Sequence, residues 1–315
     1  MIPDLFLRDL ESKPVWLRAL AERLATTEWP VRPGQRLLLT GMGSSWFAAD
    51  VAARRFRRVG VHAVADLASV EASLPPQADL AVVGISASGG STETLQMLTS
   101  HRGVSTTIAL TNTEVDLPAD HRLLMHAGPE DGGVACRSYL HTIVMLLQLE
   151  QQLTGSLPDL APRVLAAADA VEHLLATRDE WLPRVEAVLN GPNGSWLLAP
   201  AERLGSALQG ALMLREGPRV PADGCETGDW CHVDVYLTRS LDYRALLFAG
   251  SRFDASAAKW MRERGSRYVV VGQTSEAAAG AEVVIEFPHD HDPLVALLVE
   301  VLVPELLAAG WWIGR

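Results

Sequence analysis

The chain has 315 residues, of which 48% are hydrophobic and 21% charged, proportions typical of a globular protein long enough for two domains. Its formal net charge of −11 argues against nucleic acid as a partner, because phosphate backbones require a basic face. Three cysteines are too few for a disulfide framework, and the N-terminus lacks the basic start and apolar core of a signal peptide. We therefore expect a cytoplasmic location.

The most apolar stretch of the sequence is residues 293–314. Glu300, Pro304 and Glu305 interrupt it, which favours a buried C-terminal helix over a membrane span. We accordingly expect no membrane among the partners of this chain.

Apolar runs and helical patterns alternate along the first half, after an amphipathic helix expected over residues 5–25. The expected strands are 36–41, 61–67, 79–86 and 106–112, and the expected helices are 44–60, 91–103 and 137–153. Short strands that are apolar throughout are typical of a parallel sheet covered by helices on both faces.

The same alternation recurs in the second half, after a helical stretch at residues 160–190. The expected strands are 195–200, 244–251, 268–273 and 282–288, and the expected helices are 203–217, 254–265 and the C-terminal segment. The duplication lies in the topology and not in an obvious sequence repeat. The sequence therefore predicts an α/β fold of two doubly wound parallel-sheet subdomains in tandem, residues 1–155 with the N-terminal helix and residues 156–315.

Two strands of the first half end in turns of small and hydroxylated residues, "TGMGSSWFAAD" at 40–50 and "SASGGSTETL" at 86–95. In a doubly wound sheet the ligand lies where strands end beside helix N-termini, and free N–H groups with the helix dipole favour an anion there. A helix cap needs one hydroxyl, whereas the second turn has four within seven residues. The pattern favours phosphate binding over capping alone.

A dinucleotide site is the alternative. Gly41 and Gly43 follow a strand, and Asp66 lies 23 residues after Gly43, near the spacing of a ribose-binding acid. However, Trp46 occupies the third glycine position, where its ring would obstruct close packing of the helix on the strand. The dinucleotide-binding motif also does not include a second phosphate-binding turn. We therefore expect no nicotinamide cofactor.

The two turns resemble the paired phosphate-binding motifs of the sugar isomerase (SIS) superfamily, in the double-domain arrangement of the isomerase half of glucosamine-6-phosphate synthase. The resemblance covers nearly the whole chain and continues at "AGPEDGGVACRSY" (127–139) and "ALQGALMLREGPRVPADGCETGDWCH" (207–232). It implies phosphate contacts from four serines, backbone approach of two residues to the sugar, and three further binding residues. These are Ser45, Ser86, Ser88 and Ser91, then Val134 and Cys136, then Gly43, Ser44 and Ala87, the last standing where the synthase has a glutamine.

Glu216 ends the helix expected over 203–217, just before Gly217 and Pro218. The negative end of the helix dipole disfavours a carboxylate there, and burial would raise its pKa toward neutrality, which suits a general base. By position alone, an exposed glutamate at a helix end is the commoner case. The resemblance implies that Glu216 is the base that moves a proton between sugar C1 and C2.

His232 lies sixteen residues after Glu216, at the spacing of the family's ring-opening histidine. In related enzymes that histidine reaches the pocket from the partner subunit, so the resemblance implies a homodimer with shared active sites. A packing role is the alternative for a lone histidine. Cys225, Cys231 and His232 could suggest zinc, but a fourth ligand is not evident, and we expect no metal.

The sequence departs from the synthase in several ways. Met213 stands where the synthase carries a lysine, the chain stops at "GWWIGR" without the lysine-bearing tail, and neither a glutaminase domain nor a cysteine at position 2 precedes it. Glutamine-dependent synthesis is therefore not expected. The strand ends "LLAPAERLG" (197–205) and "LFAGSRFDA" (247–255) are poor in hydroxyls, which predicts one sugar site per protomer, in the first-half crevice.

The residues and the resemblance thus predict an isomerase of a phosphorylated sugar, or a deaminase or deglycase of an amino-sugar phosphate, that works through an enediol or enolamine and requires no cofactor. The alternative is a binding module that senses a phosphosugar without reaction. Met213 and the missing tail favour the sensor, whereas the presence of both Glu216 and His232 opposes it. The lack of a basic DNA-binding segment argues against a transcriptional regulator.

Overall fold

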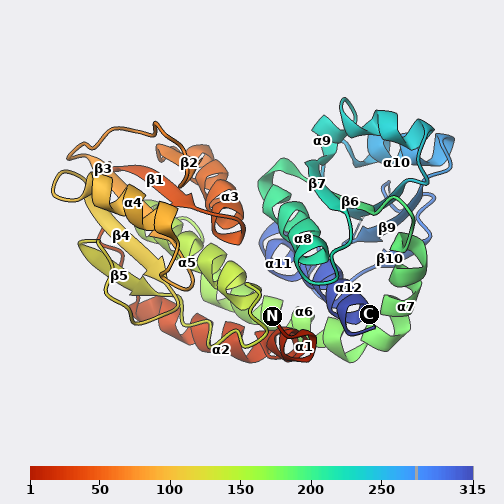
Figure 1. Ribbon diagram of the computed structural model, residues 1–315, viewed down its shortest axis with the longest axis horizontal. Helices are drawn as coiled ribbons and strands as arrows, with labels where there is room; N and C mark the ends of the chain where they lie inside the picture. The colour runs from red at the N-terminus through yellow and green to blue at the C-terminus, as the bar shows by residue number, and fades with distance from the viewer. Residues whose placement is uncertain (274–275, 315) are drawn as a thin grey trace. The chain divides into compact units, whose positions relative to one another are not determined.

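The structure is a computed structural model that describes residues 1–273 and 276–314. The chain packs as two compact units, each built on one five-stranded parallel sheet (Figure 1). The N-terminal unit comprises Trp16–Glu130 and Ala135–Val164, and the C-terminal unit comprises Met1–Val15, Asp131–Val134 and the chain from Leu165 onward. The predicted α/β fold of two doubly wound parallel sheets in tandem is confirmed.

In the N-terminal unit the sheet has the order β2-β1-β3-β4-β5. Its strands are β1 (Arg36–Gly41), β2 (Ala63–Leu67), β3 (Leu80–Ile85), β4 (Thr106–Thr111) and β5 (His121–Leu124). Its helices are α2 (Lys13–Arg23, which begins in the C-terminal unit), η1 (Leu24–Thr26), α3 (Ser44–Arg58), α4 (Thr92–His101) and α5 (Arg137–Thr154). All six residues of the central strand β3 are buried, which explains its unbroken apolar sequence. Because β1 has β2 on one side and β3 on the other, the strand order reverses between β1 and β3, the usual ligand crevice of such sheets.

In the C-terminal unit the sheet has the order β10-β9-β8-β6-β7, which is the same topology. Its strands are β6 (Ser195–Ala199), β7 (Ala222–Glu226), β8 (Arg244–Phe248), β9 (Arg267–Val271) and β10 (Val283–Ile285). The helices are α1 (Pro3–Glu11), α6 (Leu160–Ala176, which begins in the N-terminal unit), α7 (Arg178–Leu189), η2 (Ala201–Arg203), α8 (Leu204–Glu216), α9 (Thr227–Trp230), η3 (Asp234–Arg239), α10 (Asp254–Glu263), α11 (Pro293–Val299) and α12 (Leu302–Ile313). In this topology β6 corresponds to β1 and β8 to β3, so the duplication predicted from the element pattern is present.

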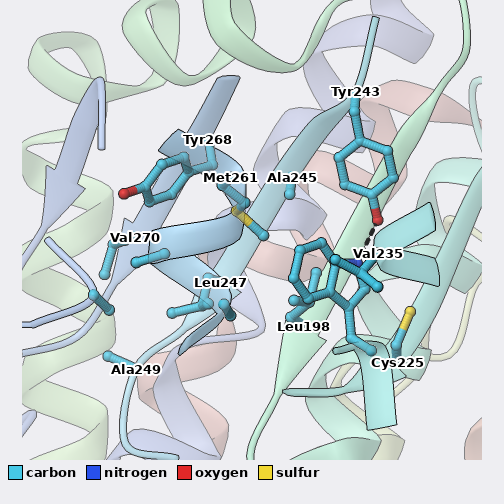
Figure 2. Close-up of a cluster of buried hydrophobic side chains, with 14 residues drawn as sticks. Leu198, Cys225, Val235, Tyr243, Ala245, Leu247, Ala249, Met261, Tyr268 and Val270 are labelled. Carbon is cyan, nitrogen blue, oxygen red and sulfur yellow. Dashed lines mark hydrogen bonds between the residues drawn. The ribbon is translucent and has the colours of Figure 1, made fainter. Parts of the chain in front are cut away.

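Aromatic packing attaches α9 to the second sheet (Figure 2). The indole Nε1 of Trp230 donates a hydrogen bond of 2.6 Å to the Tyr243 hydroxyl, drawn as a dashed line in Figure 2. The Tyr243 ring also stacks on Trp196 of β6, with ring centroids 4.2 Å apart. Buried aromatic pairs of this kind stabilise beyond their apolar area, which strengthens the attachment of α9 to the sheet.

The sequence analysis did not predict β5 and β7, and both are edge strands. The residues of β5 are exposed or half-buried, and β7 buries Cys225 alone among its five residues. An edge strand has one neighbour and needs no apolar run, so its sequence carries little strand signal. The N-terminal helix expected over 5–25 is also divided, because Pro14 lacks the N–H that would continue α1 and instead stands in the first turn of α2.

The predicted division at residues 155 and 156 stays a prediction, but the N-terminal helix packs differently from that assignment. Residues 1–15 belong to the C-terminal unit and not to the first subdomain. The Phe6 ring lies 6.1 Å from the Trp312 ring of α12, and the buried ammonium of Lys13 pairs with Glu305 of the same helix. Apolar contact and a buried ion pair thus attach the start of the chain to its last helix.

One helical segment of the described chain, Pro293–Ile313, is long and apolar enough to cross a membrane. It comprises α11 and α12, and 94% of its most apolar window is buried inside the protein. The segment is therefore buried, as its interrupting charges led us to expect, and the absence of a membrane partner stays a prediction.

Candidate functional site

The two hydroxyl-rich turns leave neighbouring strands at the reversal point of the first sheet. Gly41, the last residue of β1, is paired with Ile85, the last residue of β3. A Cβ atom at Gly41 would lie 2.7 Å from Cβ of Ser45 and 2.9 Å from the Ile85 carbonyl oxygen, so only glycine permits this close approach. The fold therefore brings both turns together at the carboxyl ends of β1 and β3.

Serine hydroxyl groups accept hydrogen bonds from backbone amides of the turn between β3 and α4. The hydroxyl of the buried Ser86 accepts a hydrogen bond from the Ser91 amide at 3.4 Å, and that of the exposed Ser88 accepts one from the Gly90 amide at 3.2 Å. Ser91 caps α4, since its hydroxyl accepts from the Thr94 amide at 3.4 Å. Capping thus accounts for Ser91, whereas Ser86 and Ser88 shape the turn itself.

The end of β4 holds the carbonyl groups of the same turn. The Asn112 amide donates to the Ala87 carbonyl at 2.9 Å, and the Thr113 hydroxyl donates to the Ser88 carbonyl at 3.1 Å. The neighbouring strand end thus engages two carbonyls of the turn, while the amides of Gly89, Gly90 and Ser91 donate within the turn itself. Asn112 and Thr113 are supporting residues that the sequence analysis missed, because only the sheet order reveals their proximity to this turn.

The other turn begins α3 without a carboxylate cap. Its N-cap residue is Gly43, which has a φ of 50° and no side chain. Ser44 is buried and Ser45 half-buried in the first turn of the helix. Since the positive end of the helix dipole lies here, this N-terminus favours an anion from outside the protein. Gly43, Ser44 and Ser45 therefore lie just after the carboxyl end of β1, and their contact with phosphate stays a prediction.

At Cys136 the structure adds a detail that limits the predicted contact. Oε1 of Glu130 accepts hydrogen bonds from the Cys136 and Arg137 amides, each at 2.7 Å, and from the Ser138 amide at 3.1 Å. This carboxylate occupies the N-terminus of α5, so the Cys136 amide is engaged within the protein. A sugar contact through the Cys136 backbone would have to use its carbonyl. Val134 is buried and belongs to the Asp131–Val134 segment of the C-terminal unit.

The two predicted catalytic residues both belong to the C-terminal unit. Glu216 is the last residue of α8 and is half-buried, and burial raises the pKa of its carboxyl group. His232 is exposed, and its amide donates to the Asp229 carbonyl at 2.8 Å just after α9. Glu216 therefore has the electrostatic property expected of a general base, while the roles of both residues stay predictions.

The thiols near His232 are engaged within the protein. Sγ of Cys225 donates to Asp234 Oδ2 at 3.0 Å, and Sγ of Cys231 donates to the Thr227 carbonyl at 3.4 Å. Burial raises the pKa of both thiols, which disfavours the thiolate form that binds metals. Within residues 1–273 and 276–314, no group of three or more His, Cys, Asp or Glu residues is arranged to hold a metal ion.

No family model matches the chain, but sequence relatives exist. Over 311 residues it is 25% identical to the isomerizing glutamine–fructose-6-phosphate aminotransferase of Thermococcus kodakarensis, an alignment that covers 93% of this chain and 50% of the relative. The protein of the same name from Aquifex aeolicus is 24% identical over 315 residues, with 94% of this chain and 52% of the relative covered. The chain thus spans about half the length of the curated relatives it matches.

Solved structures share the whole fold. The C-terminal domain of glucosamine-fructose-6-phosphate aminotransferase from Francisella tularensis has a TM-score of 0.80 at 17% identity, covering 98% of this chain and 95% of that one. Tagatose-6-phosphate ketose/aldose isomerase from Escherichia coli has a TM-score of 0.77 at 17% identity, with 98% and 92% covered. Glucosamine-6-phosphate deaminase from Thermotoga maritima has a TM-score of 0.76 at 17% identity, with 99% and 95% covered. The predicted resemblance to double-domain SIS proteins is confirmed.

Proposed function

We propose that this protein binds a phosphorylated sugar, preferably an amino-sugar phosphate, and moves a proton between its C1 and C2 atoms. The observation that carries the proposal is the pairing of two hydroxyl-rich turns at the strand-order reversal, where β1 and β3 end beside the N-termini of α3 and α4. The relatives named for phosphosugar isomerisation, deamination and transamination support the same class of substrate.

In the proposed complex the phosphate lies between the two turns. Ser45 donates from the first turn of α3, and Ser86, Ser88 and Ser91 donate from the turn before α4. In the structure the Ser91 hydroxyl donates to Glu93 Oε2 at 3.1 Å, so in the proposed complex the phosphate replaces Glu93 as its acceptor. Hydroxyl and amide donors at two helix N-termini stabilise a dianion without a basic side chain, in keeping with the acidic composition of the chain. Ala87, where a glutamine would occupy more space, leaves room beside the phosphate.

Glu216 is the proposed base. Its carboxylate removes a proton from one of the two carbons to form an enediol or enolamine, and returns the proton to the other carbon. For an amino sugar, the resulting ketose imine reacts with water to release ammonia and the ketose phosphate. The raised pKa of Glu216 strengthens the carboxylate as a base, because the proton that it takes up is held more tightly.

His232 is proposed to protonate the ring oxygen as the sugar ring opens. The side chain is exposed on its own subunit, which supports the implied arrangement in which it serves the active site of a second copy. We therefore propose a homodimer with shared active sites. The proposed location is the cytoplasm. Acid–base chemistry of this kind requires neither a metal nor a redox cofactor.

Proton exchange in D₂O, followed by NMR, tests the proposal. The protein is incubated with fructose 6-phosphate, glucosamine 6-phosphate and fructosamine phosphates, beside Glu216→Gln and, as a matched control, Glu202→Gln at an exposed carboxylate of the same unit. We expect deuterium to enter at C1 or C2 with the wild-type and Glu202→Gln proteins but not with Glu216→Gln. Saturable binding without exchange would indicate a phosphosugar sensor, and no binding would reject the ligand class.

A further inference from the structure

The residues that follow β4 lie between two segments that the proposed function uses. In the first sheet β4 is flanked by β3 and β5, so its carboxyl end lies between the turn after β3 and the loop after β5 (Figure 1). The turn after β3, residues 86–91, is called the phosphate turn here. The loop after β5, residues 125–130, begins the connection to α5. Asn112 is the first residue after β4.

Asn112 contacts the two segments with different parts of itself. Its main-chain amide donates to the Ala87 carbonyl of the phosphate turn at 2.9 Å. Its side chain bonds loop 125–130 instead, since Oδ1 accepts from the Ala127 amide at 2.8 Å and Nδ2 donates to the Gly128 carbonyl at 2.7 Å. One side-chain amide thus supplies both an acceptor and a donor to the loop. A substitution at this position can therefore remove the bonds to the loop and leave the bond to the turn.

The remaining contacts between β4 and the phosphate turn do not involve the Asn112 side chain. The Thr111 hydroxyl also donates to the Ala87 carbonyl, at 3.2 Å, and the Thr113 hydroxyl donates to the Ser88 carbonyl at 3.1 Å. Any residue other than proline at position 112 keeps the main-chain amide. Loss of the side chain therefore leaves the support of the phosphate turn in place.

The far end of loop 125–130 is bonded to the start of α5. Oε1 of Glu130 accepts hydrogen bonds from the Cys136 and Arg137 amides, each at 2.7 Å. The Arg137 side chain donates from Nη2 to the Pro129 carbonyl. Cys136 is the N-cap residue of α5 and is one of the predicted sugar contacts. A continuous path of bonds thus joins the phosphate turn, through Asn112 and the loop, to Cys136.

The loop also contains an unfavourable backbone conformation next to the Asn112 contact. His126 has a φ of 54°, in the left-handed region that residues with a side chain rarely adopt. Such a conformation persists only where surrounding contacts compensate for it. Ala127, the next residue, is bonded by Asn112, so loss of that side chain removes one of these contacts. We expect the loop to shift when this bond is lost.

We propose that Asn112 is a positioning residue, whose side-chain amide holds the segment that leads to Cys136 in its place beside the phosphate turn. This role rests on the proposed function. A sugar whose phosphate is bound at one end must present C1 and C2 correctly at the other. The relative position of the two segments should therefore affect the rate of proton transfer much more than it affects phosphate binding, because small displacements of reacting groups have large effects on rate.

The test measures phosphate binding and sugar chemistry separately in the full chain. The ¹⁵N-labelled Asn112→Ala variant is titrated with inorganic phosphate, followed through the Gly89 and Gly90 amide signals. Its proton exchange in D₂O is measured with fructose 6-phosphate and glucosamine 6-phosphate. We expect a phosphate dissociation constant within about twofold of the wild-type value and an exchange rate lower by about tenfold or more. The Cys136 amide signal should also differ from its wild-type position.

Gln152→Ala is the matched control. The side-chain amide of Gln152 bonds a distant backbone in the same way, since Oε1 accepts from the Trp29 amide at 2.8 Å and Nε2 donates to the Trp29 carbonyl at 2.9 Å. It lies near the C-terminal end of α5, at the opposite end of that helix from Cys136. Urea unfolding measures the stability of both variants. We expect Gln152→Ala to exchange protons at the wild-type rate.

The outcomes are distinct from one another. A wild-type exchange rate in Asn112→Ala would overturn the inference, and so would parallel losses of phosphate affinity and rate, which would show that the side chain merely supports the phosphate turn. An equal loss of rate in Gln152→Ala would attribute the effect to general destabilisation and would overturn it too. If Asn112→Ala does not fold, Asn112→Ser should show the same separation of binding from rate. If the wild type neither binds phosphate nor exchanges protons, the proposed function fails and the positioning role fails with it.

Discussion

The indole of Trp312 lies against the backbone of Gly217, so that a Cβ atom at Gly217 would be 3.0 Å from Cε3 of the ring. Gly217 directly follows Glu216, and its amide donates to the Met213 carbonyl at 3.1 Å to end α8. The path of the chain after the proposed base is therefore determined by contact with α12, a helix far from it in sequence.

The Gly217→Ala variant should lower the proton exchange rate on the order of tenfold, because small displacements of a catalytic group have large effects on rate. Its free energy of unfolding should fall by about 1 kcal/mol from overpacking against Trp312. Gly310→Ala is the control, since a Cβ atom there meets nothing within 4 Å. In that helical position alanine should be neutral or stabilise by up to about 1 kcal/mol. NMR exchange and urea unfolding measure both effects, and normal exchange by Gly217→Ala would contradict the positioning role.

The exchange rate should also depend on pH through Glu216. Burial raises its pKa above the ordinary value of a glutamate, and the base must be ionised, so the rate should fall as pH decreases through that raised pKa. The effect on stability has the opposite direction. The folded state holds the proton more tightly than the unfolded state, so Glu216 makes the protein less stable as pH rises from its unfolded to its folded pKa. Urea unfolding of wild type and Glu216→Gln should show wild type losing stability relative to the variant over that range.

Two adjacent glycines in the phosphate turn should respond differently to alanine. Gly89 has a φ of +69°, and a Cβ atom there would lie 2.5 Å from Cγ2 of Val115, whereas at Gly90 the nearest atom would be 3.5 Å away. We expect Gly89→Ala to cost roughly 1–2 kcal/mol and to weaken phosphosugar binding, because the turn must change shape. Gly90→Ala should change stability by less than about 0.5 kcal/mol. Equal stability of the two variants in urea unfolding would show that the turn does not require this backbone conformation.

The buried pair of Lys13 and Glu305 should be important for stability. Both side chains are 0% exposed, so removing the ammonium from beside the buried carboxylate by Lys13→Met should cost about 3–5 kcal/mol. Lys13→Met combined with Glu305→Gln should cost less than the sum of the single changes, because the buried negative charge is removed as well. Urea unfolding of the four proteins gives the coupling free energy, and a value near zero would show that the pair does not act together.

The Asp254 carboxyl group should produce a measurable dependence of stability on pH. Burial raises its pKa to about 6, well above the ordinary value of an aspartate, although the Gly250 and Ser251 amides favour the charged form. Since the raised pKa belongs to the folded state, its contribution to stability is complete below about pH 4 and is lost as pH rises through 6. The difference in unfolding free energy between wild type and Asp254→Asn should fall by roughly 2 kcal/mol between pH 4 and pH 7. A constant difference would contradict this account.

Much of the architecture could be predicted from sequence where burial is continuous. Residues 80–85 form an unbroken run without a charged or hydroxylated residue because β3 is covered on both faces, and the run identifies the strand without knowledge of its neighbours. The edge strands β5 and β7 could not be found in this way, since their residues face solvent on at least one side. The segments 40–50 and 86–95 identified the candidate phosphate crevice because each contains its hydroxyl groups and glycines within a few residues.

Local patterns of neighbouring residues were enough to predict the alternating elements and the two hydroxyl-rich turns, and composition alone gives the acidic character of the chain. Contacts between distant segments became visible only in the three-dimensional structure. Asn112 and Thr113 lie against the turn between β3 and α4, Trp312 lies against Gly217, and Arg203 donates to the Ala249 carbonyl. The structure also placed residues 1–15 with the C-terminal unit. These contacts join segments far apart in the chain, and the hydrophobic burial that brings them together is not directional. Their partners therefore follow from sheet order and packing geometry, which no local sequence pattern contains.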